Sequence, residues 1–411
     1  MNISKGGYQL TQPLPKKLPL SDLINDVFDG PRRIHFIEDG VPYIRLGDLD
    51  AGEIYFDPNQ KIAPANLDQH FYLRPEDVLV TKTGDEPRAM ITSSETENAL
   101  TAPDIYCLRV NKDLISPTWL AYYLNTSFGQ RLLSEKSSGS VLRRLNLTEL
   151  RSLPVVFPPL SLVTEIETLE RQAQEHTLAA HDIWTATQKG MYSEIDERSV
   201  FKQNTVNLSL NKFLDTPSAR KVYRSLGEVA QIAISSRKLL KPDQMVKYVQ
   251  VSDIDPRSFL FRRQRKALAK DLPSRIRLPL QSFQVLLLAL GSNLGTPTHP
   301  IAVVDAQLEG GFASNAFLAL EFPETQIYFA ISLKHPIVLE QLHQMAVGAT
   351  VSTIRRKDIV NLKIPVLSNV WRQDFNGRAL LAWERRSLAL ALRRQAIEKA
   401  ESFLLQMRDG G

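Results

Sequence analysis

The strongest constraint on the fold of this chain is that its sequence contains the same order of motifs twice. Residues 43–50, Tyr-Ile-Arg-Leu-Gly-Asp-Leu-Asp, correspond to residues 248–255, Tyr-Val-Gln-Val-Ser-Asp-Ile-Asp, and the Pro-Val pair at Pro154 corresponds to that at Pro365. The offset between the copies is 205 residues at the start (43 to 248) and 211 at the end (154 to 365). Each match is weak, but their order and spacing agree, which indicates a tandem duplication of one globular domain.

Each copy is followed by a stretch with the pattern of a long helix. After the first copy, apolar side chains recur at spacings of three and four residues while Glu and Arg fill the other faces; the stripe includes Leu162, Ile166, Leu169, Ala173 and Ile183. Near the end of the chain, four large apolar residues lie seven apart, namely Trp383, Leu390, Ile397 and Leu404. A helix with one narrow apolar stripe cannot bury that stripe alone. We therefore predict two long helices that pack on each other as an antiparallel coiled coil.

The copies and the helices together predict an α+β fold with two tandem globular domains. Each copy contains short strands, turns at glycine and short helices. Two homologous domains joined to an antiparallel helix pair are expected to be related by a pseudo-two-fold axis. The predicted segments are an extended N-terminal arm (1–18), a first domain (19–158), a central helix (159–188), a linker (189–222), a second domain (223–368) and a C-terminal helix (372–408).

The composition is that of a globular protein with room for two cores. The chain has 411 residues, of which 43% are hydrophobic and 23% charged. The single cysteine, Cys107, excludes an internal disulfide and a Cys-cluster zinc site, and the seven histidines show no metal-ligand spacing. No apolar run reaches the roughly 18 residues of a membrane span, and the N-terminus lacks a signal-peptide pattern. We therefore predict no metal site and a cytoplasmic location.

Positive charge is concentrated in the second half of the chain. Residues 1–160 carry 17 Lys and Arg against 20 Asp and Glu, a balance of −3. Residues 205–368 carry 21 against 12, a balance of +9. Such an asymmetry suggests contact with a polyanion, although a basic face is as often only solvated.

The helix lengths suggest what two tethered domains could do. A helix of about 25 to 30 residues is about 40 Å long. One turn of B-DNA is about 34 to 36 Å, so such a helix pair could hold two domains over two sites about one turn apart. The predicted architecture therefore suits a ruler for a split DNA sequence.

Sequence motifs for catalysis are missing. The chain has no Gly-x-x-x-x-Gly-Lys-Ser/Thr phosphate loop and no Asn/Asp-Pro-Pro-Tyr/Phe element of an amino-methyltransferase. Glu76, Asp77 and Lys82 loosely suggest a nuclease site, but acidic residues before a buried strand are common, and the structural interpretation is favoured. The chain is predicted to be non-catalytic and to bind no cofactor.

Two stretches of the first copy resemble a known family. The run Arg74-Pro-Glu-Asp-Val-Leu-Val-Thr-Lys-Thr-Gly84 is followed by Ser138-Gly-Ser140 and by Leu145-Asn-Leu-Thr-Glu-Leu-Arg-Ser-Leu-Pro-Val-Val-Phe-Pro-Pro-Leu160. This combination resembles the specificity subunit of type I restriction-modification systems. The second copy is degenerate, because the Lys-Thr-Gly turn is replaced by Ala289-Leu-Gly291.

The resemblance implies a function for both copies. In that family each domain is a target-recognition domain that reads one half of a bipartite double-stranded DNA target, and the subunit itself is not catalytic. The helices set the spacer and dock two methyltransferase subunits, which carry S-adenosylmethionine, and restriction subunits can join them. The alternatives are a non-catalytic scaffold or inhibitor protein with the same architecture in another anti-phage system and, less favoured, a DNA methyltransferase or nuclease in its own right.

Candidate DNA contacts in the first copy are polar side chains on loops. Base edges are read by hydrogen bonds, whereas phosphates need only positive charge or N–H groups. The predicted contacts are Lys82, Thr83, Arg88, Lys136, Ser138, Ser140, Arg143 and Arg144. The alternative for Arg143 and Arg144 is that they cap carbonyls or pair with surface acids.

The second copy contains the densest basic stretch, residues 261–266, which is the best phosphate-binding candidate. The basic residues predicted to contact DNA are Arg237, Lys238, Arg262, Arg263, Arg265, Lys266, Arg355 and Arg356. Side chains that could read bases follow Gly291, namely Ser292, Asn293, Thr298 and His299.

The long helices also carry more aromatic and Arg side chains than the line of contact between the two helices, here called the seam, would bury. These are Trp184, Trp383, Arg385, Arg386, Arg393 and Arg394. Excess aromatic and Arg side chains are typical of protein interfaces, so we expect the faces beside the seam to meet a methyltransferase.

Overall fold

The computed structural model describes residues 17–409 except for eleven internal gaps. These are 33–34, 51–52, 55–60, 64–67, 84–87, 139–143, 200–208, 234–239, 255–257, 262–263 and 349–350. The chain divides into two compact units, and the first combines two segments that are far apart in sequence. Unit 1 comprises residues 1–174 and 389–411, and unit 2 comprises residues 175–388.

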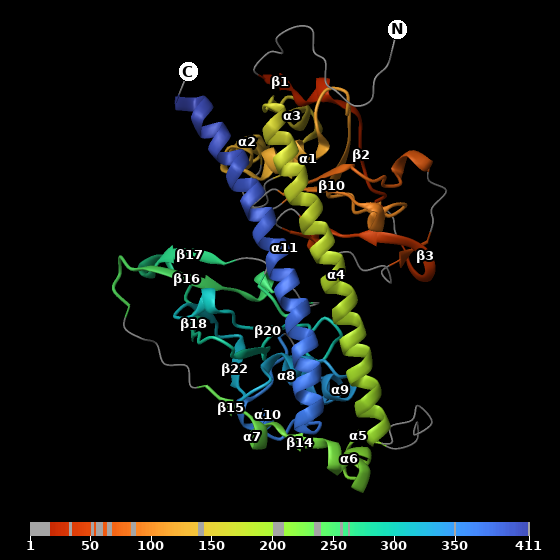
Figure 1. Cartoon of the computed structure of the whole chain (residues 1–411), viewed down its shortest axis with the longest axis vertical. Helices are drawn as coiled ribbons and strands as arrows, with labels where there is room; N and C mark the ends of the chain where they lie inside the picture. Colours follow the sequence, from red (N-terminus) through yellow and green to blue (C-terminus); the bar gives the residue numbers. More distant parts are fainter. Residues whose placement is uncertain are drawn as a thin grey trace. The chain divides into compact units, whose positions relative to one another are not determined.

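Unit 1 is built on a four-stranded antiparallel sheet in the order β2-β10-β7-β8, of which β2 and β10 are labelled in Figure 1. Its strands are β2 (Ile24–Asp29), β10 (Ile105–Val110), β7 (Val78–Thr81) and β8 (Ala89–Ile91). All four residues of β7 are buried, because Val78 and Val80 face one apolar cluster and Leu79 faces another on the opposite side of the sheet. This explains why the sequence of β7 is apolar throughout and does not alternate.

Smaller elements complete unit 1. The remaining strands are β1 (Lys17–Pro19), β3 (Phe36–Ile44), β4 (Leu49–Asp50), β5 (Glu53–Ile54), β6 (Lys61–Ile62), β9 (Leu100–Thr101), β11 (Ser137–Ser138), β12 (Arg144–Leu145) and β13 (Pro154–Val156). The helices are α1 (Pro117–Asn125), α2 (Ser127–Glu135), α3 (Leu147–Arg151) and the 3-10 turns η1 (Leu20–Leu23), η2 (Leu46–Asp48), η3 (Gln69–Phe71) and η4 (Ser94–Thr96). Helix α1 packs on β7 and β8. Of the predicted N-terminal arm, residues 1–16 lie outside the described residues, and β1 pairs with β13 instead of extending freely.

Unit 2 has the same plan. Its central sheet has the order β15-β22-β19-β20 and consists of β15 (Gln231–Ile232), β22 (Phe317–Glu321), β19 (Val285–Leu288) and β20 (Ile301–Val303). The other strands are β14 (Tyr223–Ser225), β16 (Met245–Val249), β17 (Arg265–Leu268), β18 (Ile276–Pro279), β21 (Phe312–Ser314) and β23 (Lys363–Pro365). The helices are α5 (Leu210–Leu214), α6 (Pro217–Val222), α7 (Leu226–Val229), α8 (Gln326–Leu333), α9 (Pro336–Met345), α10 (Arg356–Ile359) and the 3-10 turns η5 (Val251–Asp253), η6 (Ala269–Asp271) and η7 (Ala306–Leu308).

The strand pairings confirm the duplication predicted from the sequence. The central sheets of the two units are antiparallel and have corresponding strand orders. In each copy one strand pairs in parallel with a later one: β3 with β9, at Tyr43 and Leu100, and β16 with β21, at Tyr248 and Phe312. A two-stranded ladder, β1 with β13 or β14 with β23, precedes the long helix of each copy.

Two hydrogen bonds recur at equivalent positions. The Asp48 Oδ2 atom accepts a bond from the Arg45 backbone N–H at 2.8 Å, and the Asp253 Oδ2 atom accepts one from Gln250, also at 2.8 Å. Each carboxylate caps the 3-10 turn that follows the parallel strand. The Asp48 and Asp253 match is therefore a structural equivalence, made by the same local contact in both copies.

Helices α4 (Leu160–Ser199) and α11 (Asn369–Asp409) each contribute one part to both units (Figure 1). In unit 1, Lys399 Nζ lies 2.7 Å from Glu165 Oε2, and Arg393 Nε lies 3.2 Å from Glu170 Oε2. In unit 2, Arg385 lies 3.3 Å from His176, and a Cβ atom at Gly190 would lie 3.6 Å from Phe375. In these contacts, higher residue numbers on α4 pair with lower residue numbers on α11. The two helices therefore run antiparallel within each unit, as predicted.

The central helix is longer than predicted. Residues 189–199 were expected in the linker, but α4 continues to Ser199. The reason is that Met191 and Ile195 are fully buried in the core of unit 2 and continue the apolar stripe of the helix. Helices α5 and α6 occupy a further part of the predicted linker.

The seam of the helix pair is shifted by one residue from the prediction for the C-terminal helix. The buried positions of α11 are Phe375, Ala379, Ala382, Arg386, Ala389, Arg393, Ala396, Ala400 and Leu404. Of the predicted seam, only Leu404 is buried, and Trp383, Leu390 and Ile397 are half-buried beside the alanines. On α4, Ile166 and Ala173 are buried as predicted, whereas Leu162, Leu169 and Ile183 are half-buried at the flank.

The aromatic and Arg side chains expected at a partner interface are largely used inside the units. Trp184 packs edge-on against Phe259 with ring centroids 4.9 Å apart, and Trp383 packs against the same core. Arg386 and Arg393 are 5% exposed, so they belong to the seam. The interface prediction is therefore wrong for Arg386 and Arg393, because periodicity alone does not reveal which large side chains their own domain covers, and it stays a prediction for the half-buried Trp184 and Trp383.

Tyrosine hydroxyls at corresponding positions of the two copies differ in their hydrogen bonding. Tyr123 Oη donates to the Pro154 carbonyl at 2.6 Å, whereas Tyr328 Oη donates to Pro365 at 3.2 Å and also accepts from the Leu367 N–H at 2.9 Å. We expect Tyr123→Phe to cost about 1 kcal/mol and Tyr328→Phe about 2 to 3 kcal/mol, because the second change leaves both a buried donor and a buried acceptor without this partner. Urea unfolding measures both values, with Tyr248→Phe as control. Equal losses would contradict the additional hydrogen bond that Tyr328 accepts.

Candidate nucleic-acid interface

Lys82 was predicted to contact DNA, but the structure places it inside the protein. Its side chain is only 2% exposed and forms an ion pair with Asp29. The ammonium also donates to the Pro103 carbonyl at 2.6 Å and lies 4.2 Å from the centre of the Tyr106 ring. Burial lowers the pKa of Lys82, and the Asp29 carboxylate opposes that shift. The prediction is wrong for Lys82, which anchors the end of β7 to β2 and cannot reach a phosphate.

Arg88 is likewise used within the domain. Its Nη1 atom donates to the Leu49 carbonyl at 2.6 Å, and its backbone N–H donates to Thr81 Oγ1 at 2.9 Å. The guanidinium therefore holds β4 against the central sheet and is not a loop side chain that extends toward a ligand. Lys136 pairs with Glu149 at 2.9 Å, but its side chain is 41% exposed, so it stays accessible.

The predicted contacts that stay accessible in the first copy lie where β12 approaches the end of β7. Thr83 and Arg144 form an antiparallel bridge. The Arg144 side chain is 56% exposed, and its Nη1 atom lies 3.7 Å from Asp104 Oδ1. An exposed pair at this distance is weak, so Arg144 is available for an anion. Ser140 and Arg143 lie outside the described residues, as does the side chain of Ser138.

In the second copy, Arg265 has a structural partner. Its guanidinium makes a bidentate contact with Asp253, with Nε to Oδ2 at 2.9 Å and Nη2 to Oδ1 at 2.8 Å. The paired guanidinium is 25% exposed and holds η5 to β17, so Arg265 has a structural role, and its contact with phosphate stays a prediction. Lys266 follows on β17 and is exposed, because successive side chains of a strand point to opposite faces. Arg237, Lys238, Arg262 and Arg263 lie outside the described residues.

The segment after Gly291 contains both accessible and buried members of the predicted set. Ser292, Asn293 and Thr298 are exposed. His299 is fully buried, and its Nδ1 atom accepts from the Gly295 N–H at 2.8 Å. Burial, assisted by the charge of Lys334, lowers the pKa of His299 to about 3. The suggestion that His299 reads bases is therefore wrong, because it is a neutral side chain that closes the turn from inside.

The equivalent edges of the two copies differ in polarity. Leu290 bridges Thr353 as Thr83 bridges Arg144. Beside this bridge, Leu290, Val347 and Val351 are 41%, 48% and 52% exposed. The second copy thus has an apolar edge where the first has an exposed arginine, and the sequence signals this as the loss of the Lys-Thr-Gly turn.

Two arginines near the apolar edge are exposed but have partners. Arg355 Nε lies 2.6 Å from Asp358 Oδ2, and Arg356 Nη2 donates to the Ile232 carbonyl at 2.5 Å. The Arg355 side chain is 57% exposed, so its pairing with Asp358 is a weak surface interaction. Both arginines therefore stay candidates for phosphate contact.

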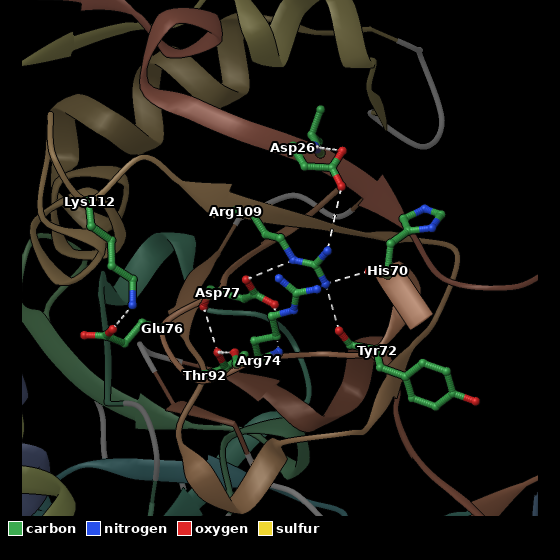
Figure 2. Close-up of polar contacts among 10 residues, drawn as sticks. Asp26, His70, Tyr72, Arg74, Glu76, Asp77, Thr92, Arg109 and Lys112 are labelled. Atoms are coloured by element: carbon green, nitrogen blue, oxygen red, sulfur yellow. Dashed lines mark hydrogen bonds and ion pairs between the residues drawn. The ribbon is translucent and has the colours of Figure 1, made fainter. Parts of the chain in front are cut away.

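The acidic residues that suggested a nuclease belong to a structural network (Figure 2). Arg109 donates to the carbonyls of His70 at 2.6 Å and Tyr72 at 2.9 Å, and it lies 3.7 Å from Asp77. Burial is the main cause that raises the pKa of Asp77. Glu76 pairs separately with Lys112. No motif or spacing marks Arg109 in the sequence, because it lies in an otherwise apolar strand.

Asp77 and Lys82 lie at opposite ends of β7. Five residues along a strand correspond to roughly 16 Å, so the two side chains are too far apart to belong to one catalytic site. In the described parts of the chain, no three His, Cys, Asp or Glu side chains are grouped so that they could hold a metal ion. Among the described helices, none is both long and apolar enough to cross a membrane.

His299 makes unit 2 sensitive to acid. The unfolded imidazole binds a proton below about pH 6.5, whereas the folded one does so only near pH 3, so stability is lost as the pH falls through this window. We expect the wild-type protein to lose about 2 kcal/mol more than His299→Asn between pH 7.5 and 5. Urea unfolding followed by tryptophan fluorescence measures this difference, with exposed His181→Asn as control. Equal acid sensitivity of wild type and His299→Asn would contradict it.

Comparisons with known proteins give matches among solved structures. No protein-family model matches the chain, and no curated protein is significantly similar. A type I restriction-modification S subunit from M. genitalium is 14% identical over 93% of this chain and 95% of its own, with a TM-score of 0.41. The HsdS subunit from Thermoanaerobacter tengcongensis is 14% identical over 94% and 95%, with a TM-score of 0.30. A chain from a study of assembly and conformational transition of the type I R-M system is 15% identical over 95% and 98%, with a TM-score of 0.32. All three come from type I restriction-modification systems.

Proposed function

We propose that this chain is the DNA-specificity subunit of a type I restriction-modification system. Residues 19–158 and 223–368 act as target-recognition domains, and each reads one half of a bipartite double-stranded target. Helices α4 and α11 determine the spacing of the two half-sites. The chain itself is non-catalytic, and it directs methylation and restriction by subunits that bind to it.

The observation that carries this proposal is the duplication. The same sheet order, the same parallel strand pair and the same capped 3-10 turn occur in both copies, and each copy is followed by a long helix. A chain with two related readers needs a spacer between them, and a pair of antiparallel helices supplies one of fixed length. The sequence motifs of the first copy support the same function.

The accessible cations define how DNA would be held. Arg144 on the edge of the first copy is suited to a base edge or a phosphate, because a guanidinium offers several donors in one plane. Lys266 on β17 and Arg356 at the start of α10 are suited to phosphates. Ser292 and Asn293 add neutral hydrogen-bonding groups in the second copy.

The partners follow from the proposed role. Two methyltransferase subunits, one for each copy of the duplicated plan, bind the chain and carry S-adenosylmethionine, and restriction subunits join that complex. The exposed face of α11 supports such docking, because Leu381 and Leu388 are each 45% exposed and Arg385 is exposed between them. Apolar side chains beside an arginine are typical of protein interfaces.

One observation favours a second function, that of a scaffold protein without sequence readout. The apolar edge formed by Leu290, Val347 and Val351 is better suited to a protein surface than to phosphates. A scaffold would bind its protein partners but show no preference among DNA sequences. The two functions are therefore separated by a measurement of sequence preference.

Selection of bound duplexes from a random library by the full chain, together with its methyltransferase subunits, tests the proposal. We expect enrichment of one bipartite motif. Arg144→Ala should weaken binding of that motif about 10- to 100-fold by losing a base contact, or lower the salt dependence by about one phosphate if it binds the backbone. Arg378→Ala, an exposed helix residue paired with Asp374, is the matched control. Binding without sequence preference, or an Arg144→Ala variant indistinguishable from the control, would contradict the corresponding part of the proposal.

A further inference from the structure

We propose that Arg393 is a positioning residue that fixes the register of α4 against α11 in unit 1. It does so as the shared cation of two buried carboxylates on different elements. The effect of this role on the spacing of the two DNA half-sites rests on the proposed function, whereas the register of the two helices does not.

The contacts of Arg393 connect three parts of unit 1. The guanidinium lies 3.2 Å from Glu170 on α4 and 3.3 Å from Glu53 on β5. All three side chains are less than 10% exposed. Tyr122 on α1 donates its hydroxyl to the same Glu170 carboxylate at 2.5 Å. One ion cluster therefore joins both long helices to the globular part of the unit.

The alanines beside Arg393 do not select a register as strongly as the ion cluster does. On α11, the buried neighbours of Arg393 are Ala389, Ala396 and Ala400, and α4 contributes Ala173. If one helix slid by seven residues so that Ala396 took the place of Ala389, alanine would replace alanine in that layer, although Phe403 would take the place of Ala396. The apolar packing in the Ala389 layer would change little, because an alanine side chain is a single methyl group. Regular heptads thus permit more than one register unless a polar residue distinguishes them.

A slip would break the ion cluster. Seven residues correspond to about 10 Å along a helix, so Arg393 would leave both Glu170 and Glu53. Two carboxylates and a guanidinium would then be buried without their present partners, which is strongly unfavourable in a low-dielectric interior. Arg386, seven residues earlier on α11, could approach Glu170 after such a slip, but Arg393 would then need another partner.

The register matters for the proposed ruler. A shift of about 10 Å between the helices corresponds to about three base pairs at 3.4 Å each. A mixed population of registers would therefore recognise half-sites at more than one spacing. A single buried cluster can prevent this without any further apolar packing.

Cross-linking between introduced cysteines measures the register directly. Glu165 and Lys399 form an ion pair at 2.7 Å, so Glu165→Cys with Lys399→Cys reports the observed register. Glu165→Cys with Leu392→Cys or with Gln406→Cys reports slips of one heptad in either direction. The native Cys107 is fully buried, and burial raises the pKa of its thiol, so it reacts little with a short bis-maleimide.

The decisive variant is Glu53→Gln, Glu170→Gln and Arg393→Met combined, because it removes the charges and keeps hydrogen-bonding groups for Tyr122. We expect the ratio of native to slipped cross-links to fall at least about tenfold while circular dichroism still shows a folded helical protein. Arg394→Met, the same change on the exposed neighbouring residue, should leave the ratio unchanged.

Retention of the native ratio in a folded triple variant would overturn the proposal. So would an equal change in Arg394→Met. If the single Arg393→Met variant fails to fold, the triple variant decides the question, because it leaves no buried carboxylate opposite a missing cation. The readout needs no DNA, so a failure of the register proposal is distinct from a failure of the proposed function.

Discussion

The antiparallel pairing of α4 with α11 is the constraint on which both units depend. Unit 1 is not a continuous segment, since it closes only when residues 389–411 return to residues 1–174, and unit 2 is the segment 175–388 between them in the sequence. The core around Trp119 contains Ile166 from α4 together with Ala396 and Leu404 from α11. The last helix of the chain therefore completes the core of the first domain.

Among the described residues, ion pairs that are partly or fully buried occur at several places where the sequence suggested ligand or partner binding. Lys82 is neutralised by Asp29, Arg265 by Asp253 and Arg393 by Glu170 and Glu53. In each case a cation holds together elements that are distant in sequence or at the edge of a sheet. Removing one partner of such a pair is far more costly than removing the pair, so these side chains define the geometry around the candidate interface.

The sequence predicted the large-scale organisation because duplication and periodicity are properties of the sequence itself. The match of Tyr43 with Tyr248 located equivalent parallel strands, and the heptad pattern located both long helices. The prediction from sequence failed where tertiary contacts determine which side chains are buried. Whether Trp383 or its neighbour Ala382 enters the seam, and whether Lys82 meets solvent or Asp29, depends on elements far away in the chain. Charge alone does not distinguish the exposed Arg144 from these buried cations.

The central claim is that the two copies together specify one split DNA target. It is tested most directly by mapping adenine methylation across the genome of cells that contain the partner methyltransferase, with and without this chain. We predict methylation at a single bipartite motif only when the chain is present, with both half-sites separated by a spacer of fixed length. Methylation that is the same in both cells, or that appears at unsplit motifs, would contradict it.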